Sequence, residues 1–208
     1  MIKIGVSGIA GSGKSLFCGF FKNDNGFVLD LDGVAHDMYS DRESSVYREV
    51  IATFQAGVPD LVAADGSINR KALGKYVFSD GQALKKLNDI FYIKFIEYVG
   101  ALAARCCEKG YRYFVLDAAV LFDSGLDRLM DKTAWVSSPP GLTIARLVEK
   151  RGWTSEYADG VVSRQIARFA GSAEKAGFII KNDGDAEKLY LKYQNFLKEI
   201  NLDEKKSR

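Results

Sequence analysis

The sequence predicts an α/β fold in which helices cover both faces of a five-stranded parallel sheet, in three layers. Short β-rich runs alternate along the chain with stretches of helical period, and this alternation is typical of a parallel sheet. Roughly 80 residues of helical character interrupt the alternation between the second and third β-rich runs, which indicates a helical insert. The length of 208 residues corresponds to about 1.4 average domains, as expected for one domain with an appendage.

The elements of the sheet region follow from local signals. The first strand, residues 2–6, leads through a glycine-rich segment into a helix at 14–21. A turn at 23–26 precedes the second strand. Gly110 ends the helical insert before the third strand begins. The five predicted strands are 2–6, 27–30, 113–117, 134–136 and 178–180, and the other helices outside the insert are 143–151, 155–168 and 186–200. We expect the polar tail, 203–208, to be frayed and solvated.

The insert is predicted to span residues 33–110 within a single domain of residues 1–208. A turn-rich stretch at 57–67 divides the insert into two helical halves. The second half carries an apolar stripe at helical spacing, which we expect to pack in the core rather than to line a cofactor pocket: Phe91, Phe95, Val99, Leu102 and Cys106.

Composition and charge exclude several classes of protein. With 47% hydrophobic and 27% charged residues and only 3 prolines, the chain is not a disordered tail. The net charge of +2 gives no broad basic field, so we expect no nucleic-acid partner. His36 is the single histidine, which excludes a multi-histidine metal site and allows a Ser-His-Asp or Cys-His arrangement only if its ring is the base.

Cysteine usage and hydropathy bear on the compartment. Cys18, Cys106 and Cys107 match neither a zinc pair nor a disulfide framework, so we expect buried, unpaired cysteines in a cytoplasmic protein. Charged residues interrupt the longest apolar segment, 91–107, which predicts that no segment spans a membrane. The apolar start, 1–10, is too short for a signal peptide.

Residues 8–15, with the sequence GIAGSGKS, form a complete GxxxxGKS motif between a predicted strand and a predicted helix, the context that this motif requires. The glycines let backbone N–H groups turn onto phosphate oxygens, and the helix N-terminus adds partial positive charge. Lys14 is expected to reach the terminal phosphates and Ser15 to ligate Mg²⁺. The sequence therefore predicts a P-loop NTPase fold, with phosphate contacts from Gly8, Gly11, Ser12, Gly13, Lys14 and Ser15.

Three aspartates stand at predicted strand ends. Asp30 and Asp32 are two residues apart, so strand alternation predicts that both carboxylates lie on one side, over the carboxyl edge of the sheet where ligands bind in open α/β folds. There a carboxylate can accept a hydroxyl proton, although Asp32 could instead cap the following helix. Asp117 ends the third strand and matches the acid that helps to hold Mg²⁺ beside a P-loop.

Arginines cluster between the fourth and fifth strands, over residues 139–172, which we interpret as a small helical lid. Planar guanidinium groups suit the stabilisation of charge on transferred phosphoryl groups. For any single arginine, a solvated surface position is the alternative. The cluster comprises Arg146, Arg151, Arg164 and Arg168.

Several segments together resemble the dephospho-CoA kinase family in order and spacing. The resemblance covers nearly the whole chain, and the DGSINR block with its distance from Leu87-Asn88 is its most particular part. The matching segments are 8–15, 28–32 with Ala35-His36, 65–73, Val77-Phe78, Leu87-Asn88, 115–117, 121–123, Arg146-Leu147, Arg151, Gln165 and 180–182.

The resemblance implies transfer of the γ-phosphoryl group of ATP to the ribose 3′-hydroxyl of dephospho-CoA. We expect Mg²⁺ to accompany ATP; the sequence does not give the oligomeric state, for which we expect a monomer. The resemblance also implies that the helical insert binds the acceptor and that Asp32 is the base, with Asp30 beside it. It further implies that Leu16, Arg146 and Arg151 lie on the ATP side, and that the acceptor is contacted by Asp32, His36, Arg70, Asn88 and Tyr92.

Two alternatives remain open at this point. The chain could be another nucleotide or small-molecule kinase of the same fold, or a regulator that binds ATP and transfers nothing. Its departures from the usual family residues concern the acceptor pocket more than the P-loop, and they are Tyr92-Ile93, Ala119 to Asp123, Thr143 and Gly177.

Overall fold

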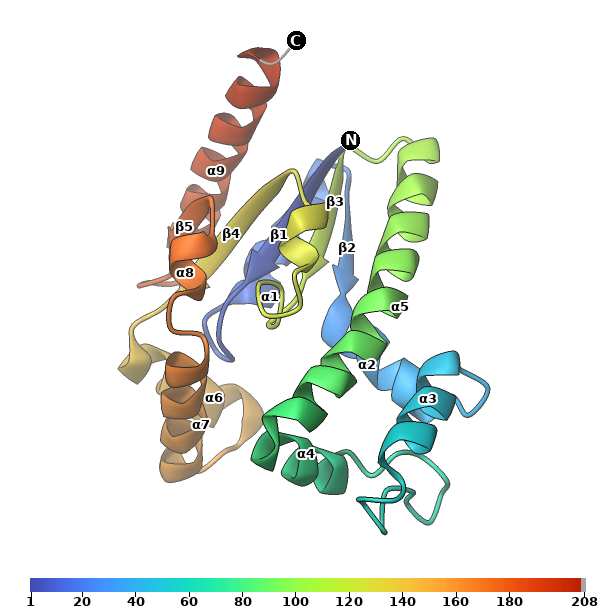
Figure 1. Cartoon of the computed structure of the whole chain (residues 1–208). Helices are drawn as coiled ribbons and strands as arrows, with labels where there is room; N and C mark the ends of the chain where they lie inside the picture. Colours follow the sequence, from blue (N-terminus) through green and yellow to red (C-terminus); the bar gives the residue numbers. More distant parts are fainter. Residues whose placement is uncertain (207–208) are drawn as a thin grey trace. The chain divides into compact units, whose positions relative to one another are not determined.

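The computed structural model describes the backbone of residues 1–206 and the side chains of residues 1–202. The chain divides into two compact units (Figure 1). The α/β unit comprises Met1–Leu29 and the chain from Ala103 onward, and the helical unit comprises Asp30–Leu102. Within the described residues, no helix has the length and apolar character needed to cross a membrane.

The α/β unit contains the predicted five-stranded parallel sheet, with strand order β2-β3-β1-β4-β5. Each predicted strand is confirmed, with ends shifted by at most two residues: β1 (Ile2–Ser7), β2 (Gly26–Asp30), β3 (Tyr113–Asp117), β4 (Lys132–Ser137) and β5 (Phe178–Lys181). The central strand β1 pairs in parallel with β3 and β4, so both of its edges are hydrogen-bonded within the sheet. In this register Val6 lies opposite Asp117 on β3 and Ala134 on β4.

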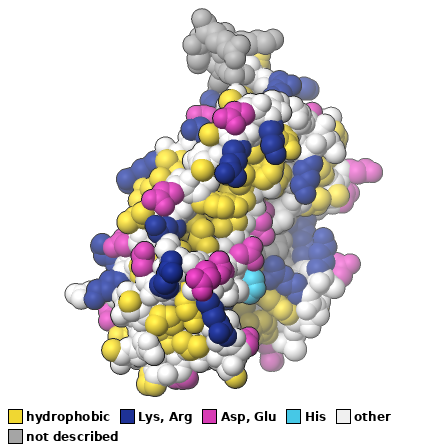
Figure 2. Space-filling model, turned by 90° about the vertical axis from the view of Figure 1, so that its right-hand side faces the viewer, with side chains coloured by type: hydrophobic (Ala, Val, Ile, Leu, Met, Phe, Trp, Pro, Cys, Tyr) yellow, Lys and Arg dark blue, Asp and Glu magenta, His cyan; other side chains and the backbone are white. Residues whose placement is uncertain are grey.

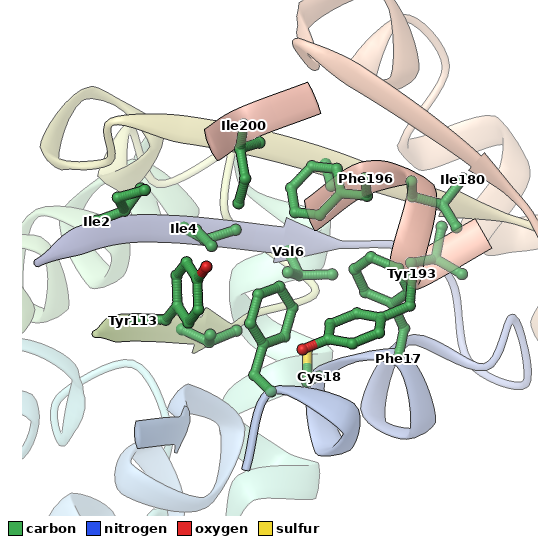
Figure 3. Close-up of a cluster of buried hydrophobic side chains, with 14 of the residues drawn as sticks. Ile2, Ile4, Val6, Phe17, Cys18, Tyr113, Ile180, Tyr193, Phe196 and Ile200 are labelled. Atoms are coloured by element: carbon green, nitrogen blue, oxygen red, sulfur yellow. The ribbon is translucent and has the colours of Figure 1, made fainter. Parts of the chain in front are cut away.

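One face of the sheet packs on α1 (Lys14–Phe20) and α9 (Ala186–Lys206). Figure 3 shows Ile4 and Val6 of β1 facing the rings of Phe17 and Tyr193 from these two helices. Phe17 is fully buried and makes edge-to-face contacts with Phe21, Tyr193 and Phe196, with ring centroids 5.9, 5.8 and 5.7 Å apart. This aromatic cluster holds α1, and with it the end of the glycine-rich loop, against the sheet.

A buried phenol is satisfied within the same cluster. The Tyr193 hydroxyl donates a hydrogen bond of 2.6 Å to Asp24, which lies in the 3₁₀ turn η1 (Phe21–Asp24) after α1. Burial raises the pKa of Tyr193, and the bond to Asp24 raises it further, so the phenol remains a proton donor.

The opposite face is covered by the segment that follows β3. Gly5 alternates with Ile4 and Val6 and therefore faces the other way, toward the side chains of Leu121 and Met130. This segment includes the 3₁₀ turn η2 (Leu126–Leu129), and α6 (Pro140–Arg151), α7 (Ser155–Arg168) and α8 (Ser172–Lys175) connect β4 to β5. The helices on one face, the sheet, and the segment on the other face form the three predicted layers.

The helical unit contains α2 (Leu31–Ser40), α3 (Ser45–Phe54), α4 (Arg70–Ser79) and most of α5 (Gly81–Glu108). The turn-rich stretch lies between α3 and α4, as predicted. Ser44 and Asn69 cap α3 and α4 by accepting hydrogen bonds from Tyr47 N–H and Ala72 N–H. The predicted stripe on α5 is buried at Phe91, Phe95, Val99 and Cys106, whereas Leu102 is half-buried and Ala103 is buried instead.

Three local predictions were wrong. Cys107 is exposed, because it follows Cys106 on α5 and adjacent helix positions face different directions, although all three cysteines are free. The last helix does not end at residue 200: α9 continues to Lys206, and residues 207–208 of the predicted frayed tail lie outside the described part. The helix predicted to begin at 143 begins at Pro140, a residue whose fixed φ suits the first helical position.

We predict that Phe17→Ala lowers the free energy of unfolding by about 3–5 kcal/mol, because a buried ring in contact with three others leaves a cavity. Urea unfolding monitored by circular dichroism measures the effect. Leu191→Ala on α9 is the control, since Leu191 is 58% exposed and its truncation should change stability by less than about 0.5 kcal/mol. Equal losses in both variants would contradict the assigned core.

Candidate active site

The GxxxxGKS segment connects β1 to α1, as predicted. Gly13 is the N-cap of α1, with φ 93°, and no side chain caps this helix end. The loop is closed by a hydrogen bond from Ser12 N–H to the Ile9 carbonyl, 3.1 Å long. Since the first N–H groups of a helix have no partner within it, this end of α1 is suited to bind an anion.

Gly8 and Gly11 of the loop leave no room for a side chain. A Cβ on Gly8 would lie 2.5 Å from the Val136 carbonyl oxygen of β4. Gly11 has φ 78°, and a Cβ there would lie 2.9 Å from the methyl group of Thr143 on α6. Thr143, one of the departures from the family's usual residues, is fully buried and donates to the Pro139 carbonyl. The loop backbone is thus packed closely on β4 and α6.

Lys14 and Asp117 form a nearly buried ion pair. The Lys14 Nζ atom contacts Asp117 Oδ1, and the two side chains are 11% and 5% exposed. The pairing follows from the sheet register, which places the end of β3 beside the end of β1. An ammonium has three donors, so Lys14 can contact this carboxylate and phosphate oxygens together.

Arg146 lies on α6 with its guanidinium bonded to protein groups. Nη1 donates to the Ser138 hydroxyl at 3.1 Å, and Nη2 donates to Asn182 Oδ1 at 3.2 Å and to the Gly184 carbonyl at 2.6 Å. Burial lowers the pKa of this guanidinium from its ordinary value. These bonds join the turn after β4 to the turn after β5, both at the carboxyl edge of the sheet.

The other arginines of the predicted lid have different surroundings. Arg151 ends α6 with its guanidinium 5.1 Å from the centre of the Trp153 ring, and Gly152 ends the helix in the left-handed conformation. Arg168 of α7 pairs with Asp123, one of the departures from the family's usual residues, at 3.4 Å. Gln165 of α7 accepts a hydrogen bond of 2.7 Å from the Ala10 N–H, so this helix contacts the phosphate loop directly.

In the helical unit, the prediction for Asp30 and Asp32 was wrong in its geometry. β2 ends at Asp30 and α2 begins at Leu31, so strand alternation does not continue to Asp32. Asp30, rather than Asp32, is the N-cap, because its Oδ1 accepts from the N–H groups of Asp32 and Gly33 at 3.1 and 3.3 Å. Asp32 lies exposed in the first turn of α2.

His36 and Arg70 are brought together although they lie 34 residues apart. Arg70 Nη1 lies 2.8 Å from His36 Nδ1. Because a guanidinium can only donate, the imidazole accepts at Nδ1 and carries its proton on Nε2. The single histidine is visible in cyan on the surface in Figure 2. An exposed polar pair thus forms between the middle of α2 and the first residue of α4.

The ring of Tyr39 packs against the Arg70 guanidinium of this pair. Tyr39 lies one turn after His36 on α2, with the Arg70 guanidinium 5.9 Å from the centre of its ring. Its ring also packs on Phe91 of α5, with centroids 4.7 Å apart. Burial raises the pKa of Tyr39 to about 12, and the charge of Arg70 opposes the rise. Asn88 is exposed and Tyr92 is half-buried four residues later, so both lie along one side of α5.

No group of three or more His, Cys, Asp and Glu side chains that could hold a metal ion occurs in the described part of the chain. The residues predicted to hold Mg²⁺ are Ser15, exposed in the first turn of α1, and Asp117. Magnesium bound with a nucleotide needs only one or two protein ligands, because phosphate oxygens and waters complete its shell. The residues present therefore fit this ion when it arrives with phosphate.

The predicted site residues did not include Asn182 or Tyr39. Asn182 directly follows β5 at the edge of the sheet where ligands bind, and Asp117 was singled out by the same position at a strand end. Tyr39 stands three residues after His36, on the same side of α2. The strand-end position could have singled out Asn182, and the helical spacing from His36 could have singled out Tyr39.

Comparison with known proteins gives a consistent result. The sequence profile of the dephospho-CoA kinase family (CoaE) matches residues 2–188. The chain is 30% identical over 197 residues to a dephospho-CoA kinase of Fusobacterium nucleatum, covering 95% of this chain and 97% of the other. It is 32% identical over 190 residues to one of Chlorobaculum tepidum, covering 89% and 88%.

Structural similarity agrees with the sequence match. The crystal structure of TT1252 from Thermus thermophilus superposes with a TM-score of 0.75 at 25% identity, covering 95% of this chain and 97% of that one. The phosphate loop with its Lys14–Asp117 pair, the sheet order and the full-length match agree, and the chain belongs to the dephospho-CoA kinase family.

Proposed function

We propose that this chain transfers the γ-phosphoryl group of ATP to the ribose 3′-hydroxyl of dephospho-CoA, the activity of its family, and that it does so with the residues assigned below. The observation that carries the assignment is the buried Lys14–Asp117 pair beside an uncapped helix N-terminus that follows a glycine-rich loop. The full-length family match supports the choice of substrates.

On the nucleotide side, the backbone N–H groups of residues 8–16 surround the phosphates of ATP. Lys14 contacts the terminal phosphates and stabilises the charge that spreads over the transferred group. Arg146 and Arg151 approach from α6, where a guanidinium fork can bind phosphate oxygens in pairs. The loop donors are backbone groups already held in place by packing on β4 and α6, so we expect the loop to need little rearrangement on binding.

Ser15 and Asp117 are the residues that would hold Mg²⁺. Bound there, the ion would neutralise charge between the phosphates of ATP. The contact of Asp117 with Lys14 pairs its buried carboxyl with an opposite charge and fixes its position at the end of β3.

On the acceptor side, Asp32 accepts or orients the proton of the attacking hydroxyl. Its carboxylate is exposed at the start of α2, while Asp30 is occupied with capping that helix. Arg70 contacts an anionic group of the acceptor, and His36 and Tyr39 fix the direction of its guanidinium. Asn88 and Tyr92 add polar groups along α5.

Free cysteines throughout fit a reducing compartment, and we place the protein in the cytoplasm on that basis. The balanced charge, net +2, favours a small-molecule acceptor over nucleic acid. We propose that the protein is a monomer.

An acceptor panel tests the function. Purified protein is incubated with ATP and Mg²⁺, and ADP release is followed with dephospho-CoA, nucleosides or nucleoside monophosphates as the acceptor. We expect ADP release with dephospho-CoA and the formation of coenzyme A. Turnover only with another acceptor would assign a different kinase activity, and ATP binding without ADP release would indicate a regulator.

We predict that Lys14→Ala lowers turnover at least about a hundredfold, because the ammonium stabilises charge on the transferred group. The substitution also leaves the Asp117 carboxyl buried without its partner, which destabilises the fold. The double variant Lys14→Ala/Asp117→Asn removes that unpaired charge and serves as the folded control. Turnover close to wild type in either folded variant would contradict the P-loop mechanism.

We predict that Asp32→Asn lowers kcat about a hundredfold or more and leaves the Kd for ATP nearly unchanged, because asparagine keeps the shape but cannot take a proton. Steady-state kinetics with saturating dephospho-CoA and ATP binding by calorimetry measure the two effects.

Asp30→Asn is the matched control, since asparagine caps a helix as well as aspartate does. If kcat falls more in Asp30→Asn than in Asp32→Asn, Asp30 is the base. Full activity in both variants would exclude both carboxylates, with Asp123 the next residue to test.

A further inference from the structure

We propose that Asn182 is a positioning residue for the phosphate loop: its side-chain amide holds the Ser12 carbonyl and thereby aims the Gly13 N–H at the bound phosphate. The proposal rests on nucleotide binding at residues 8–15, as proposed above. Asn182 directly follows β5 and is 3% exposed. The sequence motif of the loop ends at Ser15 and assigns this asparagine nothing.

Asn182 is fixed from three directions. Its backbone N–H donates to the Ser137 carbonyl at 2.7 Å, which extends the pairing of β5 with β4. Its Nδ2 donates to the Ser12 carbonyl at 2.7 Å, and its Oδ1 accepts from Arg146 Nη2 at 3.2 Å. A carbonyl on one side and a guanidinium on the other determine which end of the amide is nitrogen.

The bond to Ser12 sets the direction of the next N–H group. The Ser12 carbonyl and the Gly13 N–H belong to one trans peptide unit and therefore point in opposite directions. With the carbonyl held toward Asn182, the N–H faces the other side of the loop. Gly13 is the N-cap of α1, where N–H groups bind anions, so this donor is set before the nucleotide arrives.

The same contact explains a second property of Gly13. A Cβ at this position would collide with Asn182 Nδ2, so the absence of a side chain is what lets the amide reach the loop backbone. The φ of 93° independently favours glycine here. The glycine and the asparagine are therefore parts of one arrangement, although 169 residues separate them in the chain.

Arg146 completes the arrangement on the far side of the amide. Its Nη2 donates both to Asn182 Oδ1 and to the Gly184 carbonyl, two residues later in the turn after β5. The turn is thereby kept in place, and Asn182 cannot rotate away from Ser12 without losing the guanidinium contact. Charge-assisted bonds of this kind are stronger than neutral ones.

The variant Asn182→Asp tests the donor role of the side-chain amide separately from its acceptor role. The carboxylate has the same size and gives Arg146 a better acceptor, but it removes the Nδ2 donor and places an oxygen against the Ser12 carbonyl. We expect the Kd for ATP, measured by calorimetry without an acceptor, to rise about tenfold or more. The KM for dephospho-CoA and the far-ultraviolet circular dichroism spectrum should change little. An unchanged ATP affinity in the folded variant would overturn the proposal.

Asn201→Asp is the matched control. Asn201 Oδ1 accepts from Arg112 Nη2 and from the Tyr113 hydroxyl, each at 3.1 Å, at the amino end of β3 and so at the opposite edge of the same sheet. We expect wild-type ATP affinity in this variant, and an equal loss in both variants would overturn a specific role for Asn182.

A double-mutant cycle adds a readout that simple destabilisation would not produce. If Arg146 acts on the loop through Asn182 in addition to its proposed contact with the phosphates, the loss of ATP affinity in the double variant should be smaller than the sum of the losses in Asn182→Ala and Arg146→Lys. Fully additive losses would overturn the coupling. Because no acceptor is present, a wild-type chain that binds ATP but fails with dephospho-CoA would contradict only the proposed function.

Discussion

The central strand β1 has neighbours on both edges, and this pairing sets where the phosphate loop begins and where Asp117 lies beside it. The register that aligns Val6 with Asp117 on β3 and with Ala134 on β4 leaves no freedom in where the chain leaves the sheet at Ser7. The loop must then turn close to β4, where the Val136 carbonyl excludes a side chain at residue 8. At the other end of the loop, the aromatic cluster around Phe17 holds α1 to the sheet. The loop is therefore fixed at both ends by packing that takes no part in chemistry.

Around the phosphate loop, the buried polar side chains of Asp117 and Asn182 have hydrogen-bond or charged partners. Asp117 is 4% exposed and its buried charge would be strongly destabilising without a partner, so its contact with Lys14 is a requirement of folding, whatever the pair contributes to the proposed reaction. The Asn182 amide is bonded at both ends for the same reason. Among the described residues, the Ser12 hydroxyl is the one buried side-chain polar atom without a hydrogen-bond partner, and it lies in the phosphate loop. An unsatisfied group is tolerated where a ligand binds, which agrees with the function assigned to this segment.

Local pattern predicted the strands, the phosphate loop and the buried stripe of α5, because each depends on contiguous residues. It failed where a long-range contact or one hydrogen bond decides the outcome. Asp30 and Asp32 were assigned to one side of a strand, but the Asp30 carboxylate caps α2 and ends the extended backbone before Asp32. The partners of Arg146 lie up to 38 residues away, and the bond between Asn182 and Ser12 spans 170, so no spacing rule could join them. Cys107 was expected to be buried from its residue type, whereas its side of α5 is exposed.

The two halves of the proposed reaction differ in how their groups are held. In the proposed assignment, ATP contacts mainly backbone N–H groups and the ammonium of Lys14, whose positions follow from the sheet. The acceptor is assigned to side chains on helices, and the Arg70 guanidinium lies between two neighbours, the His36 imidazole and the Tyr39 ring. Tyr39 is in turn packed on Phe91 in the stripe of α5. A substitution on α5 can thus change the direction of Arg70 without touching the phosphate loop. A substitution at Phe91 is therefore expected to alter acceptor affinity while ATP binding is preserved.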